Sequence, residues 1–366
     1  MKGLTYMIEH YTEDITASEP VRKLYADSVS NAVAVMRVAA KLRREQLVTP
    51  ALMARRRDEY REEYIKLLGI DVCRDVFGSR IPDAKTERVG EDELCEIERV
   101  RFKLCDGVYF TGLILWPRRR AAKAPLAIMS HGGGGSPELC SDLIGNNNYG
   151  GVVRRILARG VVVFAPQLLL WNVKPAPPGS PIPQFNTHYD RGQTDNELKQ
   201  LGASIAGFEI YEISRALDWL LADSRISPER CGMLGLSYGG FYTLYTMAYD
   251  TRIRSGWSAA FFNDRMKYCG ADFVWADSAG RFLDAEVAGL CAPRRLWVDM
   301  GLEDEVFTPD GITPELLERA RSFYDAAGVP NQLKLNLWQG GHRFSDSDEA
   351  SSGAMDFFLE GFEAYV

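Results

Sequence analysis

The chain has 366 residues, 46% of them hydrophobic and 25% charged, and a net charge of −7 at pH 7. A chain of this length and composition can bury a large core and is typical of a globular protein. It contains no run approaching the ~20 apolar residues of a membrane span, so we expect no membrane association. Acidic and basic residues are interspersed without a basic stripe, which makes nucleic acid an unexpected partner.

The compartment is predicted from the amino terminus and the cysteines. The first residues soon become acidic and lack a hydrophobic segment with a small-residue cleavage site, so we expect a cytoplasmic protein. The seven cysteines are odd in number and include no Cys-x-x-Cys pair. This pattern favours reduced thiols, and none of the cysteines is a persuasive metal ligand.

Residues 1–70 are predicted to form a helical arm. Ser18 precedes a proline in a first helical turn, and apolar residues from Val21 to Ala39 keep one face. Thr49-Pro50 repeats the capping signal before a charged helix that ends near Gly69. An apolar face on a lone helix needs a covering surface. We therefore expect the arm to pack on the main domain, to form the interface of a homo-oligomer, or to wall the substrate entrance.

Residues 90–366 are predicted to form one catalytic domain of the α/β class. Residues 96–104 and 109–116 alternate around Asp106-Gly107 and predict an antiparallel hairpin. Further strands are expected at 125–129, 161–165, 231–236, 255–260, 295–300 and 333–337, and helices at 149–158, 208–221, 241–249, 314–327 and 347–365. This alternation favours a mostly parallel central sheet with helices on both faces. The irregular segments 167–194 and 262–281 are expected to cover the site.

A candidate nucleophile follows the apolar strand at 231–236. Gly235-Leu-Ser237-Tyr-Gly239 has the Gly-x-Ser-x-Gly spacing of a strand that turns sharply into a helix. Glycines on both sides of the serine remove the side chains that would collide in such a turn. The sequence therefore predicts an exposed Ser237 hydroxyl at the carboxyl edge of the sheet.

A serine hydroxyl needs a base to activate it and an acid to orient that base. Among the four histidines, His342 directly follows the last predicted strand, so we expect it to be the base. His10 lies in the arm, His131 is expected to brace the backbone, and His188 lies in a cover segment where it could contact a substrate. For the acid we favour Asp304, which lies beyond a predicted strand end. The alternatives that remain open are Asp299, Glu303 and Glu305.

The run of glycines from Gly132 to Gly135 follows another predicted strand. Glycines allow backbone N–H groups to approach a developing oxyanion, so we expect one donor from Gly133 or Gly134 and another from the N–H of Tyr238. A glycine run can also hold phosphate, but no Lys-Ser/Thr follows it as a P-loop requires.

The order Ser237, Asp304, His342, with a His-Gly-Gly-Gly loop upstream, resembles the α/β-hydrolase superfamily. Within it the chain is similar to the branch of acetyl xylan esterases, dienelactone hydrolases and prolyl oligopeptidase-like enzymes. The segments that carry the likeness are Asp223-Ser-Arg-Ile-Ser-Pro-Glu-Arg, Ala292-Pro-Arg-Arg-Leu, Gly301-Leu-Glu-Asp-Glu-Val-Phe and Gly340-Gly-His-Arg-Phe. The resemblance implies Asp304 as the acid and His342 as the base.

The expected function is that of a serine hydrolase that cleaves a small-molecule carboxylic ester through an acyl-enzyme, with deacetylation of a carbohydrate or other small acyl substrate as the best match. No metal and no organic cofactor is needed. Trp171, His188 and Trp275 in the cover segments are candidates for substrate contact. Peptide or amide hydrolysis and carbon–carbon bond hydrolysis stay open, because the same residues serve each. An inactive hydrolase fold that acts as a binding or assembly protein is the alternative of another class.

Overall fold

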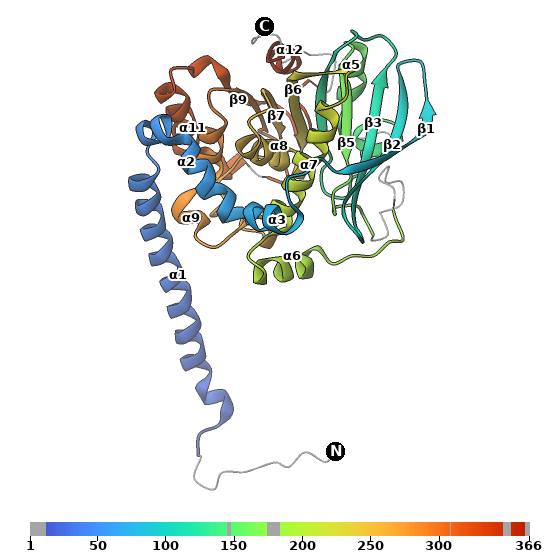
Figure 1. Ribbon diagram of the computed structural model, residues 1–366. Helices are drawn as coiled ribbons and strands as arrows, with labels where there is room; N and C mark the ends of the chain where they lie inside the picture. Colours follow the sequence, from blue (N-terminus) through green and yellow to red (C-terminus); the bar gives the residue numbers. More distant parts are fainter. Residues whose placement is uncertain (1–11, 145–147, 174–183, 308, 347–352, 363–366) are drawn as a thin grey trace, which may run out of the picture.

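The computed structural model describes residues 12–144, 148–173, 184–307, 309–346 and 353–362, and these form a nine-stranded sheet with helices on both faces (Figure 1). The strand order is β1-β2-β3-β5-β4-β6-β7-β8-β9. The pairs β1·β2, β2·β3 and β3·β5 are antiparallel, and every pair from β5 to β9 is parallel. The predicted α/β class with a mostly parallel sheet is confirmed.

The strands are β1 (Asp83–Glu91), β2 (Cys95–Cys105), β3 (Val108–Pro117), β4 (Ala124–Ser130), β5 (Val162–Pro166), β6 (Ile226–Leu236), β7 (Ser255–Ala259), β8 (Arg295–Gly301) and β9 (Leu333–Trp338). The helices are α1 (Glu19–Leu47), α2 (Pro50–Leu68), α3 (Ile70–Phe77), α4 (Pro137–Cys140), α5 (Val152–Ala158), α6 (Arg191–Gln200), α7 (Ile205–Leu221), α8 (Tyr238–Tyr249), α9 (Ser278–Arg281), α10 (Asp284–Cys291), α11 (Pro314–Ala326) and α12 (Ala354–Glu360). Short 3-10 helices are η1 (Ile15–Ser18), η2 (Ala271–Phe273), η3 (Pro309–Gly311) and η4 (Pro330–Gln332).

The predicted strands and helices agree closely with those of the structure. The strand before Ser237 starts earlier than expected, because Ile226 already pairs with Ala124 ahead of a bulge. The sequence did not predict strand β1 or the helices α3, α4, α6, α9 and α10. Of the closing helix expected at 347–365, the structure describes α12 only, and residues 347–352 and 363–366 lie outside the described part.

Helices α2 and α3 share the core of the catalytic domain. Met53 and Tyr64 of α2 are fully buried in the same apolar cluster as α7, α8, α10 and α11. The Tyr64 hydroxyl donates to the carbonyl oxygen of Tyr245 in α8 at 2.9 Å. A second cluster on the other face of the sheet contains residues of α5 and α12. Of the predicted arm, α2 therefore packs on the helices of the catalytic domain, as does α3, which follows the arm, whereas α1 has no buried residue.

Helix α1 projects away from the rest of the molecule (Figure 1). All its residues are described and none of them is buried. Its carboxyl-terminal end is attached to the catalytic domain by ion pairs of Arg43 with Asp277 and of Arg44 with Glu286. Among the helices of the described residues, none combines the length and the hydropathy that a membrane-spanning helix requires.

Candidate active site

Ser237 occupies a strained turn between β6 and α8. Its φ of 61° and ψ of −120° lie in a region that residues with side chains rarely adopt. The neighbouring glycines are required by close backbone approach. A Cβ on Gly235 would lie 2.3 Å from the Gly239 oxygen, and one on Gly239 would lie 2.0 Å from the Ser130 oxygen. The turn therefore presents a half-buried Ser237 at the carboxyl end of β6.

Asp304 and His342 follow two adjacent parallel strands. Asp304 comes after β8 and His342 after β9, so both lie at the same edge of the sheet as Ser237. The two loops are joined by the backbone N–H of Glu303, which donates to the Gly340 oxygen at 2.8 Å. A side chain at Gly301 would clash with this second loop, since its Cβ would lie 2.4 Å from the same Gly340 oxygen. The glycines thus allow the loops to pack closely.

The Asp304 carboxylate contacts the imidazole of His342. Oδ2 of Asp304 lies 2.8 Å from Nδ1 of His342, and Oδ1 accepts the backbone N–H groups of Val306 and Phe307 at 2.8 and 3.0 Å. Burial alone would raise the pKa of Asp304, but the hydrogen bonds from His342, Phe307 and Val306 lower it below its usual value. Asp304 is therefore a carboxylate at neutral pH, oriented to hold an imidazole.

The alternative acids have other surroundings. Asp299 is fully buried within β8 and accepts hydrogen bonds from the indole groups of Trp257 and Trp297, both at 2.7 Å. Burial raises the pKa of Asp299 in spite of these bonds. Glu303 and Glu305 are exposed. Of these four acids, Asp304 is the one whose side chain forms a hydrogen bond with His342 among the described residues.

The glycine run lies against the residue that follows Ser237. A Cβ on Gly133 would lie 3.3 Å from the Tyr238 ring, so this exposed glycine sits directly beside it. The N–H of Gly132 donates to the Tyr149 hydroxyl and that of Gly134 to the Leu170 oxygen, both at 2.7 Å. With the Gly134 N–H engaged in this way, Gly133 is the better candidate of the two for an oxyanion donor.

His131 braces the backbone beneath this loop. Its Nε2 accepts the N–H of Leu168 at 3.0 Å, so Nδ1 carries the proton and donates to the Gly132 oxygen at 2.9 Å. The side chain is fully buried, and burial lowers the pKa of His131 to about 4. A neutral, doubly bonded imidazole matches the bracing role expected for this residue.

The three candidate substrate residues lie in different environments. Trp171 is half-buried beside Gly134, to which it forms an isolated β-bridge, and its indole donates to the Thr187 oxygen at 2.8 Å. His188 is exposed in the same cover segment, of which residues 174–183 lie outside the described part. Trp275 packs in the main core against Phe241 and is only 9% exposed. Trp171 is thus beside the candidate site, whereas Trp275 serves the core.

Two further residues near the site were not recognised in the sequence. Tyr149 holds Gly132, and the Asn148 side chain donates to the His342 carbonyl oxygen at 3.0 Å. Both lie between β4 and α5, and Asn148 is 194 positions from His342 in the chain, while Tyr149 is 17 positions from Gly132. No local sequence pattern indicates either contact. Within the described residues, no group of three or more His, Cys, Asp or Glu side chains could hold a metal ion.

Sequence comparison provides a distant relative. No family model matches the chain. The chain is similar to "Putative hydrolase YtaP" of Bacillus subtilis (strain 168), with 24% identity over 164 residues. The match includes 42% of this chain and 54% of that protein, so the chain spans about half the length of the curated relative.

The solved structures to which this chain is similar include acetyl xylan esterases and glucuronoyl esterases. A "putative acetyl xylan esterase" from Bacteroides fragilis NCTC 9343 has a TM-score of 0.58 at 17% identity, covering 78% of this chain and 76% of that one. Acetyl xylan esterase 1 from Thermoanaerobacterium sp. JW/SL YS485 has a TM-score of 0.53 at 17% identity, with 84% and 93% covered. A glucuronoyl esterase from Solibacter usitatus has a TM-score of 0.52 at 15% identity, with 77% and 86% covered. The chain has the α/β-hydrolase fold, which confirms the superfamily resemblance at the level of the fold.

Proposed function

We propose that this protein is a serine hydrolase that cleaves a carboxylic ester. The observation that carries the proposal is the 2.8 Å contact between His342 Nδ1 and Asp304 Oδ2, at the sheet edge where Ser237 occupies a turn with a φ of 61°. Strained backbone of this kind persists where the surrounding structure enforces it, and it clusters at active sites. The geometry supports a Ser-His-Asp arrangement in the chain order of α/β-hydrolases.

In the first half of the reaction, the Ser237 Oγ attacks the acyl carbon while His342 Nε2 accepts the hydroxyl proton. Asp304 holds Nδ1 and stabilises the imidazolium that forms. The N–H groups of Tyr238 and Gly133 donate to the oxygen as it becomes negative. The bond between the acyl carbon and the alcohol oxygen then breaks, and His342 returns the proton to the leaving alcohol.

In the second half, water attacks the acyl-enzyme. His342 takes a proton from that water, the bond from the acyl carbon to Ser237 breaks, and the proton passes to the serine oxygen. The products are a carboxylic acid and free enzyme. The steps require only side chains and backbone of this chain together with water.

An acetylated carbohydrate or a similar small acyl ester is the substrate class we favour. Of the three similar structures named above, two are described as acetyl xylan esterases and one as a glucuronoyl esterase, which supports an ester on a sugar. Trp171, half-buried beside the glycine loop, offers an indole on which a sugar ring could stack. The exposed imidazole of His188 could donate to a sugar hydroxyl from the same cover segment.

A substrate panel tests the proposal. Wild type and Ser237→Ala are assayed with p-nitrophenyl acetate, acetylated xylose, a glucuronate methyl ester, an aminoacyl anilide and a β-diketone. We expect turnover of the acetyl esters by wild type alone. Turnover of the anilide or the diketone without the esters would establish amide or carbon–carbon hydrolysis instead. Equal signals from both proteins on every substrate would favour a binding or assembly protein.

A further inference from the structure

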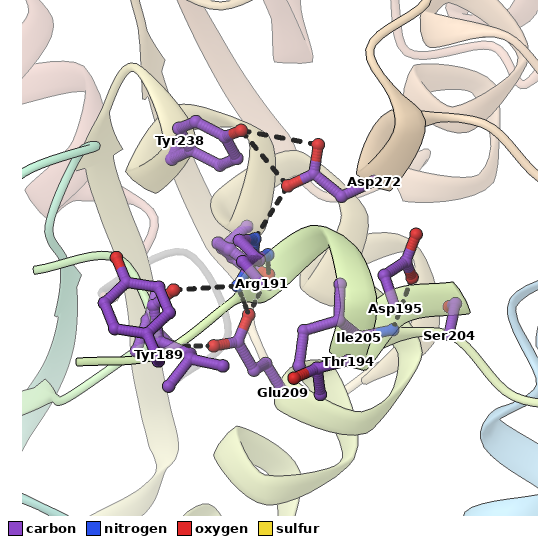
Figure 2. Close-up of polar contacts among 12 residues, drawn as sticks. Tyr189, Arg191, Thr194, Asp195, Ser204, Ile205, Glu209, Tyr238 and Asp272 are labelled. Carbon is purple, nitrogen blue, oxygen red and sulfur yellow. Dashed lines mark hydrogen bonds and ion pairs between the residues drawn. The ribbon is translucent and has the colours of Figure 1, made fainter. Parts of the chain in front are cut away.

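A largely buried ionic cluster lies next to Tyr238. Arg191 at the start of α6 donates from Nε to Asp272 at 2.7 Å and from Nη1 to Glu209 at 3.0 Å (Figure 2). These side chains are 11%, 12% and 3% exposed, respectively. Arg191 Nη2 also donates to the Tyr242 hydroxyl at 2.7 Å. A guanidinium with its planar set of donors suits such a junction of two carboxylates and a hydroxyl.

One side of the cluster reaches the residue that follows the nucleophile. The Tyr238 hydroxyl donates to Asp272 Oδ2 at 3.1 Å, and Arg191 lies 5.6 Å from the centre of the Tyr238 ring (Figure 2). Burial raises the pKa of Tyr238, and the negative charge of Asp272 raises it further, so the phenol stays protonated and remains a hydrogen-bond donor. A Cβ on Gly133 would lie 3.3 Å from the same ring. The position of the Tyr238 ring therefore limits how the glycine loop can pack.

The other side of the cluster reaches the glycine loop itself. Glu209 Oε1 accepts the backbone N–H of Leu169 at 2.7 Å, and Arg191 donates to the Leu169 oxygen at 3.3 Å. The next residue, Leu170, accepts the N–H of Gly134 at 2.7 Å. Arg191 is thus connected through hydrogen bonds to both segments that carry a candidate oxyanion donor.

We propose that Arg191 is a positioning residue that couples the two halves of the oxyanion hole. Through Asp272 it fixes the Tyr238 ring, and through Glu209 and the backbone of Leu169 it fixes the segment that holds Gly134. This inference rests on the proposed serine-hydrolase function. The cluster joins both cover segments to α8, so it sets the spacing between the two donors rather than only adding stability.

The prediction is a selective loss of transition-state binding. Asp272→Asn and Arg191→Met should each lower kcat by roughly 10- to 100-fold, on the scale of a misplaced oxyanion donor, with KM changed less than about 3-fold. Arg191→Lys should retain more activity than Arg191→Met, because it keeps the charge but not the planar donors. Tyr238→Phe, which removes a single hydroxyl, should lower kcat by a few-fold.

Asp250→Asn provides a matched control. Asp250 is also a buried aspartate paired with an arginine, Arg252 at 2.6 Å, but it lies at the opposite end of α8. A sample of each variant is titrated to completion with a fluorophosphonate, and kcat is expressed per titrated site. The affinity of each variant for a boronic acid that forms a tetrahedral adduct is measured on untreated protein. We expect boronate affinity to fall with kcat in the cluster variants and to stay unchanged in Asp250→Asn.

The outcomes separate this inference from the proposed function. A wild-type protein that is neither titrated nor active would overturn the proposed function and the inference with it. An active wild type whose Asp272→Asn and Tyr238→Phe variants keep kcat per titrated site and boronate affinity would overturn the inference alone. Tyr238→Phe leaves the ion pairs in place, so it tests the positioning role of the cluster even if the arginine variants fail to fold.

Discussion

His342 Nδ1 and Asp304 Oδ2 lie 2.8 Å apart although their residues are separated by 38 positions in the chain. The contact exists because β8 and β9 are adjacent and parallel, so the loops that follow them meet at one edge. With Nδ1 directed at the carboxylate, the imidazole has Nε2 left for a proton transfer. This relationship defines which variants should abolish activity and which should not.

The nucleophile and base should act as one unit. Ser237→Ala and His342→Ala should each lower kcat on the order of 10⁴- to 10⁶-fold, and the double variant should be scarcely worse than either single one. Steady-state kinetics with a p-nitrophenyl ester measures this. Losses that multiply in the double variant would mean that the two residues act independently.

Replacing Asp304 should affect catalysis, whereas replacing Asp299 should affect stability. Asp304→Asn removes the charge that stabilises the imidazolium, so kcat should fall by roughly 10³-fold or more while the fold remains. Asp299→Asn disturbs a buried carboxylate bonded to two indoles and should lower the melting temperature instead. Kinetics per titrated site and thermal unfolding of both variants distinguish the roles. The opposite pattern would assign the acid to Asp299.

The glycine loop should contribute to kcat rather than to KM. Gly133→Val would press a branched side chain against the Tyr238 ring and displace the adjacent N–H, which should lower kcat by roughly 10²-fold. Gly90→Val in β1 is the control, because a Cβ there meets only the end of the Ile97 side chain at 3.8 Å. Equal kcat values for the two variants would remove Gly133 from the oxyanion hole.

The free energy of unfolding should decrease at acidic pH because of the buried imidazole of His131. Burial lowers the pKa of His131 to about 4, whereas an unfolded histidine titrates near 6.5. Between these values the unfolded chain binds a proton that the folded chain excludes. The free energy of unfolding should therefore decrease as pH falls from about 6.5 to 4, by up to ~1.4 kcal/mol per pH unit from this group. Urea unfolding should show a shallower decrease for His131→Gln, and identical slopes would contradict the assignment.

We propose that helix α1 pairs with a second copy of this chain. Its large apolar residues are widely exposed, among them Val29 at 47% and Met36 at 69%, and such a face is typical of an uncovered interface. Val29→Lys combined with Met36→Lys should lower the molar mass measured by light scattering. Ser30→Glu, on the polar stripe that Lys23 and Arg37 share with it at seven-residue spacing, should not. If wild type is monomeric at all concentrations, α1 has another partner or forms a wall of the substrate entrance.

Local patterns in the sequence predicted the turn at Ser237 between β6 and α8 and the loops after β8 and β9. The glycines around Ser237 mark close backbone approaches, and Gly340 marks a tight turn in which a Cβ would lie 2.2 Å from the Trp338 ring. Most strands and helices follow in the same way from short apolar runs with turn residues between them. The prediction of the candidate nucleophile, base and acid from the sequence therefore required little knowledge of distant contacts.

Contacts between distant segments could not be predicted. Arg191 and Asp272 are 81 positions apart, and nothing near either residue indicates that both side chains are largely shielded from solvent. The many charged residues of α2 gave no sign that Met53 and Tyr64 would be buried. Both belong to the main core because α8 and α10 pack beside α2. Trp275 was expected to face a substrate, but its segment turns inward against Phe241. In each case tertiary packing, rather than local preference, determines the environment.

The most direct test of the proposed serine mechanism is mass spectrometry of the protein after reaction with a fluorophosphonate. We predict one adduct per chain, located by peptide mapping on Ser237, with ester hydrolysis lost in proportion to labelling and no adduct on Ser237→Ala. Adduct formation on Ser237→Ala equal to that of wild type, or full ester hydrolysis by a completely labelled protein, would contradict a serine mechanism at Ser237.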